Sequence, residues 1–320
     1  MTQITDPAHP STPPESASHA RLTALLRWSC ALLFFARAWQ HLRWDAPFRA
    51  LLWSQDTMEG TVGLLLGLDW QTYATSPAIA AGIAGLIKGF GVFYAICGVA
   101  TLLCTPARRW THAALVLGSV ALTFLAYCYY RDKLYRLGEF GEYATQFTLP
   151  LVFVWWIRGR LSREILLHVL RAGVALTFAC HGLYAIGFYP TPGEWVTMTT
   201  TLTGLGDTDA LRLLRFAGAF DFAVAALIFA PSRGLALPAL AYAGLWGLAT
   251  ALARSAAFVR WENLSDSTTQ WLHESMMRVP HATVPLVLFL ALRARSTTSG
   301  TAPAPAPPPE RPLASTPLLS

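Results

Sequence analysis

The sequence predicts an all-α membrane protein of about eight transmembrane helices, arranged as two parallel-repeat four-helix bundles. Two observations predict the membrane class. Of the 320 residues 54% are hydrophobic and only 13% are charged, whereas soluble domains carry about 25% charged residues. Mean hydropathy is +0.41, and twelve Trp accompany the apolar segments. A third observation, an internal repeat, predicts the two bundles.

Eight segments approach the length that spans a bilayer, which is about 20 mostly apolar residues. The fourth and the eighth have short apolar cores that contain Pro150 and Pro285. They reach spanning length only if their polar leads, from Glu139 and Glu274, belong to the helices. Pro is tolerated in membrane helices when neighbouring groups satisfy the freed carbonyl. The expected spans are 22–41, 80–104, 112–130, 139–157, 165–188, 210–230, 235–256 and 274–292.

The two ends of the chain differ in composition from the rest. Residues 1–20 are polar and rich in Pro and Ser, and residues 296–320 are of low complexity. Neither stretch carries enough apolar surface to fold, so both are predicted to be disordered tails. Between them, the first four-helix repeat is expected at 21–158 and the second at 159–295. The five Cys lie in or beside apolar segments without a CxxC motif, which is typical of packing residues.

The repeat rests on three pairs of matching segments that occur in the same order. Because each unit holds an even number of helices, both repeats have the same orientation, with a pseudo-two-fold axis along the membrane normal. Counting back eleven residues from Pro150 and from Pro285 gives Glu139 and Glu274. The pairs are "LRWSCALLFFAR" (26–37) with "LRAGVALTFACH" (170–181), "LIKGFGVFY" (86–94) with "LLRFAGAFD" (213–221), and "LPLVF" (149–153) with "VPLVL" (284–288).

Basic residues in short loops predict which side of the membrane is cytoplasmic. Placing the N-terminus inside puts most short basic loops inside and most acids in the longer outer loops. An even helix count then places both termini in the cytoplasm, and the expected location is the inner (plasma) membrane. The basic residues assigned to the inner side are Arg21, Arg108, Arg109, Arg158, Arg160, Arg163, Arg233, Arg293 and Arg295.

Charged and polar residues inside the spans gather in their outer halves. Such residues normally face protein or a water-filled cavity and have partners. One interpretation makes Lys88–Glu139 and Arg215–Glu274 helix-locking ion pairs, or lets the two cations reach the headgroups. The other is a substrate or cofactor site that opens outward. The candidate cluster comprises Arg37, Lys88 and Glu139 in the first repeat and His181, Arg215, Asp221 and Glu274 in the second.

Other site chemistries are not favoured by the sequence. His181 and His281 share one depth, as bis-His haem ligation requires, but hydrogen-bonded structural histidines are the preferred interpretation. The first repeat holds Arg37 and Gln146 at those places. No spacing matches a zinc or iron centre, and no phosphate-binding glycine loop or GxSxG is present. The basic residues form no nucleic-acid-binding stripe.

The segments "LLRWSCALLFFARAWQHL" and "VLRAGVALTFACHGLYAI" resemble the first helix of DoxX-type membrane proteins, and "RFAGAFDFAVAALIFAP" (215–231) resembles the second. The resemblance implies a tandem duplication of a four-helix unit over about 22–293, with Asp221 at the family's acidic position. The first repeat departs from the pattern with Tyr94 for the acid and Arg37 for the histidine. The family includes subunits linked to thiosulfate:quinone oxidation, so quinone is the cofactor that the resemblance implies.

Three functions follow as alternatives, and the sequence does not decide whether the chain is an enzyme. The first is an accessory to quinone-linked membrane redox chemistry. The second is a carrier or binding protein for a small solute or lipid headgroup, against which the apolar inner half counts. The third is a non-catalytic scaffold for a membrane partner. The expected surroundings are the lipid bilayer, and the outer segment 41–60, with interspersed Trp, Phe and Leu, suits a helix in the interface.

Overall fold

The computed structural model describes residues 14–298, and this part of the chain is helical without any strand. Eight helices are long: α1 (Pro14–Arg43), α5 (Pro77–Leu102), α6 (Arg109–Asp132), α8 (Ala144–Arg158), α9 (Arg163–Ala185), α11 (Asp207–Leu227), α12 (Arg233–Phe258) and α14 (Val279–Thr298). The shorter elements are α2 (Arg49–Leu52), α3 (Gln55–Leu66), α4 (Trp70–Thr75), α7 (Leu137–Glu142), α10 (Gly193–Thr203), the 3₁₀ turn η1 (Trp261–Asn263) and α13 (Leu264–Met276).

Six of the described helical segments are long and apolar enough to cross a membrane, which characterises a multi-pass membrane protein. Two of the eight expected spans are not among them. Helix α8 has 15 residues, about 22 Å at 1.5 Å per residue, which falls short of the apolar thickness of a bilayer. Helix α11 carries four acidic or basic residues in its first nine positions, which lowers its hydropathy.

The expectation that Glu139 and Glu274 begin spanning helices is wrong. Glu139 lies on α7, a separate short helix that ends before Tyr143. Glu274 lies on α13, which ends at Met276, two residues before α14 begins. In α7, Gly138 and Gly141 weaken the helix and allow it to approach its neighbour closely, and α8 begins only after Tyr143.

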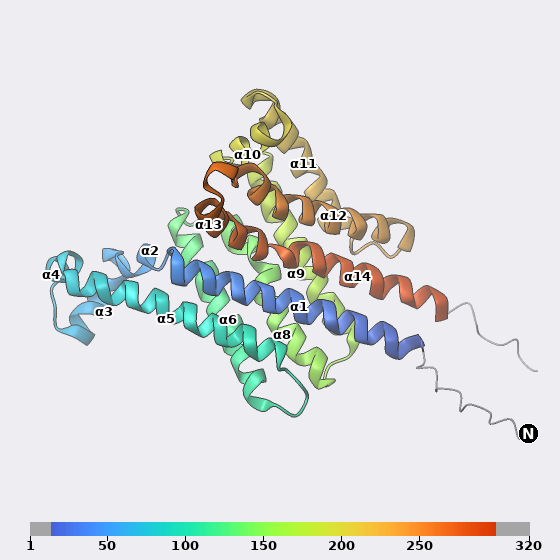
Figure 1. Ribbon diagram of the computed structural model, residues 1–320, viewed down its shortest axis with the longest axis horizontal. Coiled ribbons are helices and arrows are strands. Elements are labelled where there is room, and N and C mark those ends of the chain that lie inside the picture. Colours follow the sequence, from blue (N-terminus) through green and yellow to red (C-terminus); the bar gives the residue numbers. More distant parts are fainter. Residues whose placement is uncertain (1–13, 299–320) are drawn as a thin grey trace, which may run out of the picture.

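Both ends of the described chain lie at one end of the helix bundle (Figure 1), called the terminal end here, and the opposite end is called the cavity end. Helix α1 begins at Pro14 and α14 ends at Thr298, so both helices reach into the predicted tails, whose remaining residues lie outside the described range. At the terminal end, Arg27 donates from Nη1 to the carbonyls of Thr101, Leu102 and Cys104 at 3.0, 2.8 and 3.0 Å. This cation caps the C-terminus of α5 and fixes it against α1.

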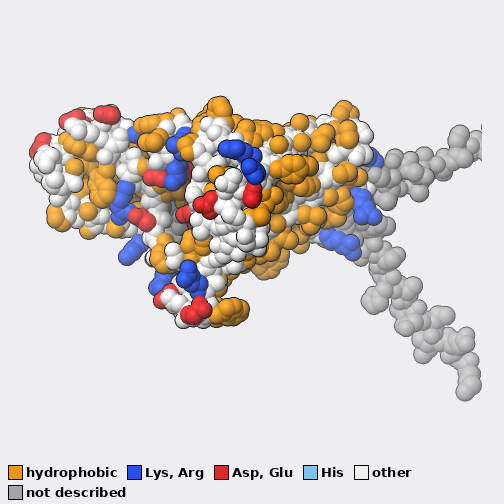
Figure 2. Space-filling model, turned by 90° about the horizontal axis from the view of Figure 1, so that it is seen from above, with side chains coloured by type: hydrophobic (Ala, Val, Ile, Leu, Met, Phe, Trp, Pro, Cys, Tyr) orange, Lys and Arg blue, Asp and Glu red, His pale blue; other side chains and the backbone are white. Residues whose placement is uncertain are grey.

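Charge is distributed unevenly along the bundle. In Figure 2 the end from which the terminal segments leave shows basic side chains and no acidic ones, while acidic side chains appear towards the opposite end. The short connections at the terminal end hold Arg108, Arg160 and Arg163, and Glu164 is the acid beside them.

The long helices pair in the same way in the two halves of the chain. Helix α1 packs on α5 as α9 packs on α11, and α6 packs on α8 as α12 packs on α14. Across the halves, α1 packs on α14 as α9 packs on α8. Figure 1 shows α1 and α14 side by side through the middle of the molecule.

Two glycines mark equivalent close approaches in these pairs. A Cβ on Gly91 of α5 would lie 2.7 Å from Cγ of Leu42 at the end of α1. A Cβ on Gly218 of α11 would lie 2.7 Å from Cβ of Ala185 and 3.0 Å from Cγ2 of Ile186 at the end of α9. In the alignment of the halves Gly91 matches Gly218 and Leu42 matches Ile186, so corresponding residues make the corresponding contact.

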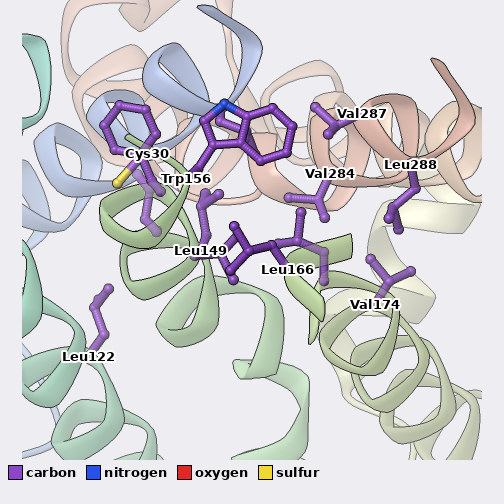
Figure 3. Close-up of a cluster of buried hydrophobic side chains, with 14 of the residues drawn as sticks. Cys30, Leu122, Leu149, Trp156, Leu166, Val174, Val284, Val287 and Leu288 are labelled. Atoms are coloured by element: carbon purple, nitrogen blue, oxygen red, sulfur yellow. The ribbon is translucent and has the colours of Figure 1, made fainter. Parts of the chain in front are cut away.

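One hydrophobic core joins the halves. It includes buried side chains from α1, α5, α6 and α8 and from α9, α11, α12 and α14. Figure 3 shows Leu149 and Trp156 of α8 near Leu166 and Val174 of α9, with Val284, Val287 and Leu288 of α14 in the same cluster. Trp156 Nε1 donates to Thr23 Oγ1 at 2.8 Å, which places this core towards the terminal end.

Candidate functional site

A cavity of about 650 Å³ lies at the cavity end, where the two halves of the chain meet. This volume is within the range of small-molecule sites. The wall draws on α6, α7, α9, α10, α11, α12 and α13 and on the end of α1. Among the lining residues are Gln40, Tyr129, Lys133, Glu139, Glu142, Tyr143, His181, Tyr184, Glu194, Trp195, Asp221, Trp246, Thr250, Arg254, Trp271, His273, Glu274 and Arg278.

Helix α7 presents two carboxylates to this cavity. Glu139 and Glu142 are three residues apart, so they lie on one face of the helix. Gly141 allows α7 to approach α9 closely, because a Cβ there would lie 2.3 Å from Sγ of Cys180. As a result Tyr184 of α9 donates to Oε2 of Glu139 at 3.3 Å.

His181 lies at the centre of the same wall. Its Nε2 is 3.6 Å from Oε2 of Glu142, and its ring is edge-on to those of Trp195, with centroids 5.7 Å apart, and His281, at 5.6 Å. Oε1 of Glu142 and Nε2 of His281 are buried and have no hydrogen-bond partner within residues 14–298. The two imidazoles are in edge-to-face contact, which is not the arrangement in which two rings face each other across a haem.

The carboxylates on α7 are held in an unfavourable environment for charge. Burial raises the pKa of Glu139. Burial first, and then the charge of Glu139, raises the pKa of Glu142 well above its usual range, although Arg278 and Arg254 act in the opposite direction. A raised carboxyl pKa means that the pair tends to retain a proton at a pH where an exposed glutamate has lost it.

A second group of charges closes the cavity on the side of α12 and α13. Arg278 Nη1 lies 2.5 Å from Oε2 of Glu274, and Arg254 Nε lies 3.9 Å from the same oxygen. Arg254 Nη1 also donates to Oε2 of Glu194 at 3.3 Å. His273 Nε2 lies 3.7 Å from Oε1 of Glu274. Both arginines are therefore engaged by carboxylates within the protein.

Asp221 lies at the deep end of the cavity. It is buried on α11, and its Oδ1 has no hydrogen-bond partner in the described part of the chain. Its position is 14 residues, about 21 Å, from the outer end of α11. Ala217, Trp246 and Met277 also line the cavity, so a single carboxyl group lies among apolar and aromatic neighbours.

Arg37 is fully buried beside the cavity without lining it. It donates from Nη1 to Gln40 Oε1 at 2.7 Å and from Nη2 to Gln146 Oε1 at 2.6 Å. Its guanidinium carbon lies 5.9 Å and 5.1 Å from the ring centroids of Tyr129 and Tyr143. The two tyrosines thus separate this cation from the cavity, and their π faces stabilise it.

The predicted ion pairs Lys88–Glu139 and Arg215–Glu274 are wrong. Lys88 and Arg215 are exposed, and neither has an ion-pair partner in the described residues. On α5 the buried face is set by residues such as Ile87, and the next residue points about 100° away from it. The cations therefore lie on the surface of the bundle, whereas Glu139 and Glu274 line the central cavity.

The structure thus gathers His181, Asp221, Glu274 and Glu139 of the predicted cluster around one cavity, places Arg37 behind its wall, and leaves Lys88 and Arg215 outside. The sequence interpretation had assigned one polar cluster to each bundle. It missed Glu142, Arg254, His273 and Arg278. The sequence held two signals for these residues. Glu142 follows Glu139 by one helical turn. Arg278 lies seven residues before Pro285, and the matching position in the first half, seven residues before Pro150, is Tyr143.

No cluster of three or more His, Cys, Asp or Glu side chains within residues 14–298 is suited to a metal ion. No family model matches the chain, and no curated protein or solved structure matches it either. Fold and cavity define the class on their own: an all-helical multi-pass membrane protein with a polar cavity at one end of the helix bundle.

Proposed function

We propose that this chain is a DoxX-like protein of eight spanning helices in two parallel repeats, and that its cavity binds a small ligand from the outer side of the plasma membrane. The architecture is supported by the equivalent helix pairings and by the matching contacts of Gly91 and Gly218. The proposed count of eight spans includes the short helix α8 and the charged helix α11. It places both termini in the cytoplasm.

One observation carries the binding function: the cavity holds buried polar atoms that the protein leaves unpartnered. Such atoms cost free energy unless something satisfies them, and they mark functional sites. Oδ1 of Asp221 is the clearest case, since it lies deep in the cavity. The hydrophobic core fills the bundle between the cavity and the terminal end. This arrangement favours a binding site that is open on one side over a carrier with two entrances.

Accessibility of introduced cysteines tests the cavity. Thr250 lines it on α12, whereas Leu248, two residues away at nearly the same depth, is exposed on the outer surface. All five native cysteines are buried, which keeps the background low. We expect Thr250→Cys to react with water-soluble methanethiosulfonates in proteoliposomes and Leu248→Cys to remain unreactive in lipid. Equal protection of both positions would contradict an open cavity.

Reporter fusions test the architecture. Fusions after Arg109 and after Arg295 should report the cytoplasm, and one after Asp266 should report the outside. A cytoplasmic signal at Asp266 would be incompatible with eight spans in two parallel repeats, because it lies between the seventh and eighth spans.

A second function, an accessory role in quinone-linked redox chemistry, is favoured by the deep end of the cavity. Ala217, Trp246 and Met277 line the cavity together with Asp221, which is the carboxyl group placed deepest along its helix. A quinone ring suits such apolar neighbours, with the carboxyl group beside one carbonyl. Extraction of the purified protein with organic solvent should then yield about one quinone per chain, and Trp246→Ala should lower that yield while Trp28→Ala, on the exposed surface, should not.

A further inference from the structure

Carboxyl groups outnumber Lys and Arg side chains in the wall of the cavity, although Asp45 is paired with Arg49, which is not part of the wall. Six carboxylates line the cavity against three cations, Lys133, Arg254 and Arg278. Both arginines are engaged by Glu274, and Arg254 also by Glu194. Lys133 pairs with Asp132, which is not part of the wall. The carboxylates are Asp45, Glu139, Glu142, Glu194, Asp221 and Glu274.

Two of these carboxyl groups have no Lys or Arg within ion-pair distance among the described residues, although Arg278 acts on both of them from farther away. Glu142 has one contact, 3.6 Å to His181, and its Oε1 is buried without a partner. Glu139 accepts only from the hydroxyl of Tyr184. Asp221 provides independent evidence, since it comes from another helix, is only 4% exposed and lines the same cavity, and its Oδ1 has no hydrogen-bond partner in the described part of the chain.

Aromatic rings stand next to the two carboxylates on α7. Tyr184 and Trp195 lie with ring centroids 6.2 Å apart and line the same part of the wall, and Trp195 also contacts the ring of His181. The face of a tryptophan or tyrosine attracts an organic ammonium group. A hydrated metal ion would gain much less from such faces, so the combination of rings with carboxylates discriminates between the two kinds of cation.

We propose that the ligand of this cavity is an organic cation, and that its ammonium group binds between Glu139, Glu142 and the rings of Tyr184 and Trp195. The inference rests on the binding function proposed above and specifies its ligand class. The nearby cation Arg37 does not line the cavity, and its guanidinium packs on the rings of Tyr129 and Tyr143.

Two methanethiosulfonate reagents of opposite charge provide the test, one with a trimethylammonium group and one with a sulfonate. Met198 lines the cavity one turn after Trp195 on α10, so Met198→Cys reports on this subsite. With rates normalised to a free thiol, we expect the cationic reagent to be favoured at least about tenfold, as for a cleft of one charge sign. Tetramethylammonium chloride should slow the reaction more than sodium chloride at equal ionic strength.

Substitution of the carboxylates should remove this preference. Glu142→Gln and Glu139→Gln, each combined with Met198→Cys, should reduce the normalised ratio several-fold. Glu262→Gln is the matched control, because Glu262 is exposed at the same end of the molecule and does not line the cavity. Variants are compared at equal elution as a single species, and Asp221→Asn serves as the alternative if an α7 variant does not fold.

The outcomes separate the two proposals. If neither Thr250→Cys nor Met198→Cys reacts, the cavity is closed and the binding function fails together with its ligand class. If both react but the normalised ratio is near one, or the anionic reagent is favoured, the cavity stands and the organic cation is ruled out. If the preference for the cationic reagent is unchanged in both Glu142→Gln and Glu139→Gln, the proposed subsite is wrong.

Discussion

Nη2 of Arg37 donates to Oε1 of Gln146 at 2.6 Å, which joins α1 to α8 inside the first half of the molecule. In the alignment of the halves Arg37 matches His181, and Gln146 matches His281, four residues before the second proline. The matching residues are again in contact, now as two imidazoles with centroids 5.6 Å apart that join α9 to α14. Corresponding positions therefore meet in both halves, while their chemistry has diverged.

The contact between Arg37 and Gln146 should contribute to stability. Gln146→Leu leaves a fully buried guanidinium without one of its two acceptors, and an unsatisfied buried polar group costs about 1–3 kcal/mol. We expect a lower thermal midpoint in detergent micelles for this variant. The double substitution Arg37→Met with Gln146→Leu should recover part of the loss, because both partners are then apolar.

Thr123→Val is a suitable control for this pair, since Thr123 donates only to Ser119 within its own helix. A double-mutant cycle in which the two single losses simply add would show that the contact contributes no coupling energy.

Glu274 should matter for stability in a way that Lys88 and Arg215 do not. Glu274→Gln removes the carboxylate that Arg254 and Arg278 share, and breaking a buried pair by removing one partner costs about 3 kcal/mol or more. Lys88→Met and Arg215→Met remove exposed cations without an ion-pair partner, so their effect should stay within about 0.5 kcal/mol. Chemical denaturation of the three variants in mixed micelles provides the comparison. Similar losses for Glu274→Gln and Arg215→Met would restore the pairing expected from the sequence.

Much of the fold is readable from the sequence because apolar length alone defines the long helices. Each of the eight expected spans overlaps a long helix, and six of these have the composition of a spanning segment. The boundaries at Glu139 and Glu274 were not readable. A polar lead that continues a helix looks the same in sequence as one that forms a separate short helix, and only the packing of Gly141 on Cys180 distinguishes them.

The site was predicted in part for a similar physical reason. Membrane charges were expected to find partners within one bundle, so Lys88 and Arg215 were assigned to the nearest equivalent acids. Which face of a helix points to the bundle centre depends on the neighbouring helices, and the sequence did not show that the halves share one cavity. His181, Asp221 and Glu139 were predicted because they are polar at a membrane depth where a polar residue costs free energy unless it faces protein or a cavity.

The pKa of Glu142 should make stability depend on pH. In the unfolded chain a glutamate has a pKa of about 4.3, and burial and then Glu139 raise it in the folded state. A raised folded pKa gives stability that is complete below the unfolded value and is lost as pH rises through the folded value. The thermal midpoint should therefore fall as the pH is raised above about 4.3. Glu142→Gln cannot ionise, so its midpoint should fall less and should exceed that of the parent protein at alkaline pH.

The groups that face Glu142 are Glu139, His181, Arg254 and Arg278. Arg254 and Arg278 favour its ionised form, so the slope measures the balance between burial and these cations. Parallel midpoint curves for Glu142→Gln and the parent protein between pH 4 and pH 9 would contradict a raised pKa. Glu262→Gln, an exposed carboxylate at the same end, is the control and should leave the curve unchanged.

The two halves should contribute unequally to ligand binding. Asp221 and Tyr94 occupy matching positions, but Asp221 lines the cavity whereas Tyr94 is fully buried between α1 and α5. With Thr250→Cys as the reporter, Asp221→Asn should lower the rate with the cationic reagent by about tenfold, the change expected when about 1.4 kcal/mol of attraction is lost. Tyr94→Phe should leave that rate unchanged, because its hydroxyl does not reach the cavity.

His181→Ala and Arg37→Ala form the second matched pair. His181 borders Glu142 and Trp195, so its removal should change protection of Met198→Cys by tetramethylammonium. Arg37 lies behind Tyr129 and Tyr143, so its loss should lower the thermal midpoint more than it changes protection. Equal effects of the first-half and second-half changes on protection would show that both halves contribute to ligand binding. The replacement of Arg37 and Gln146 by His181 and His281 in the second half would then affect packing and not binding. A loss of protection confined to the second-half changes would instead place binding where the imidazoles and the deep carboxyl group lie together.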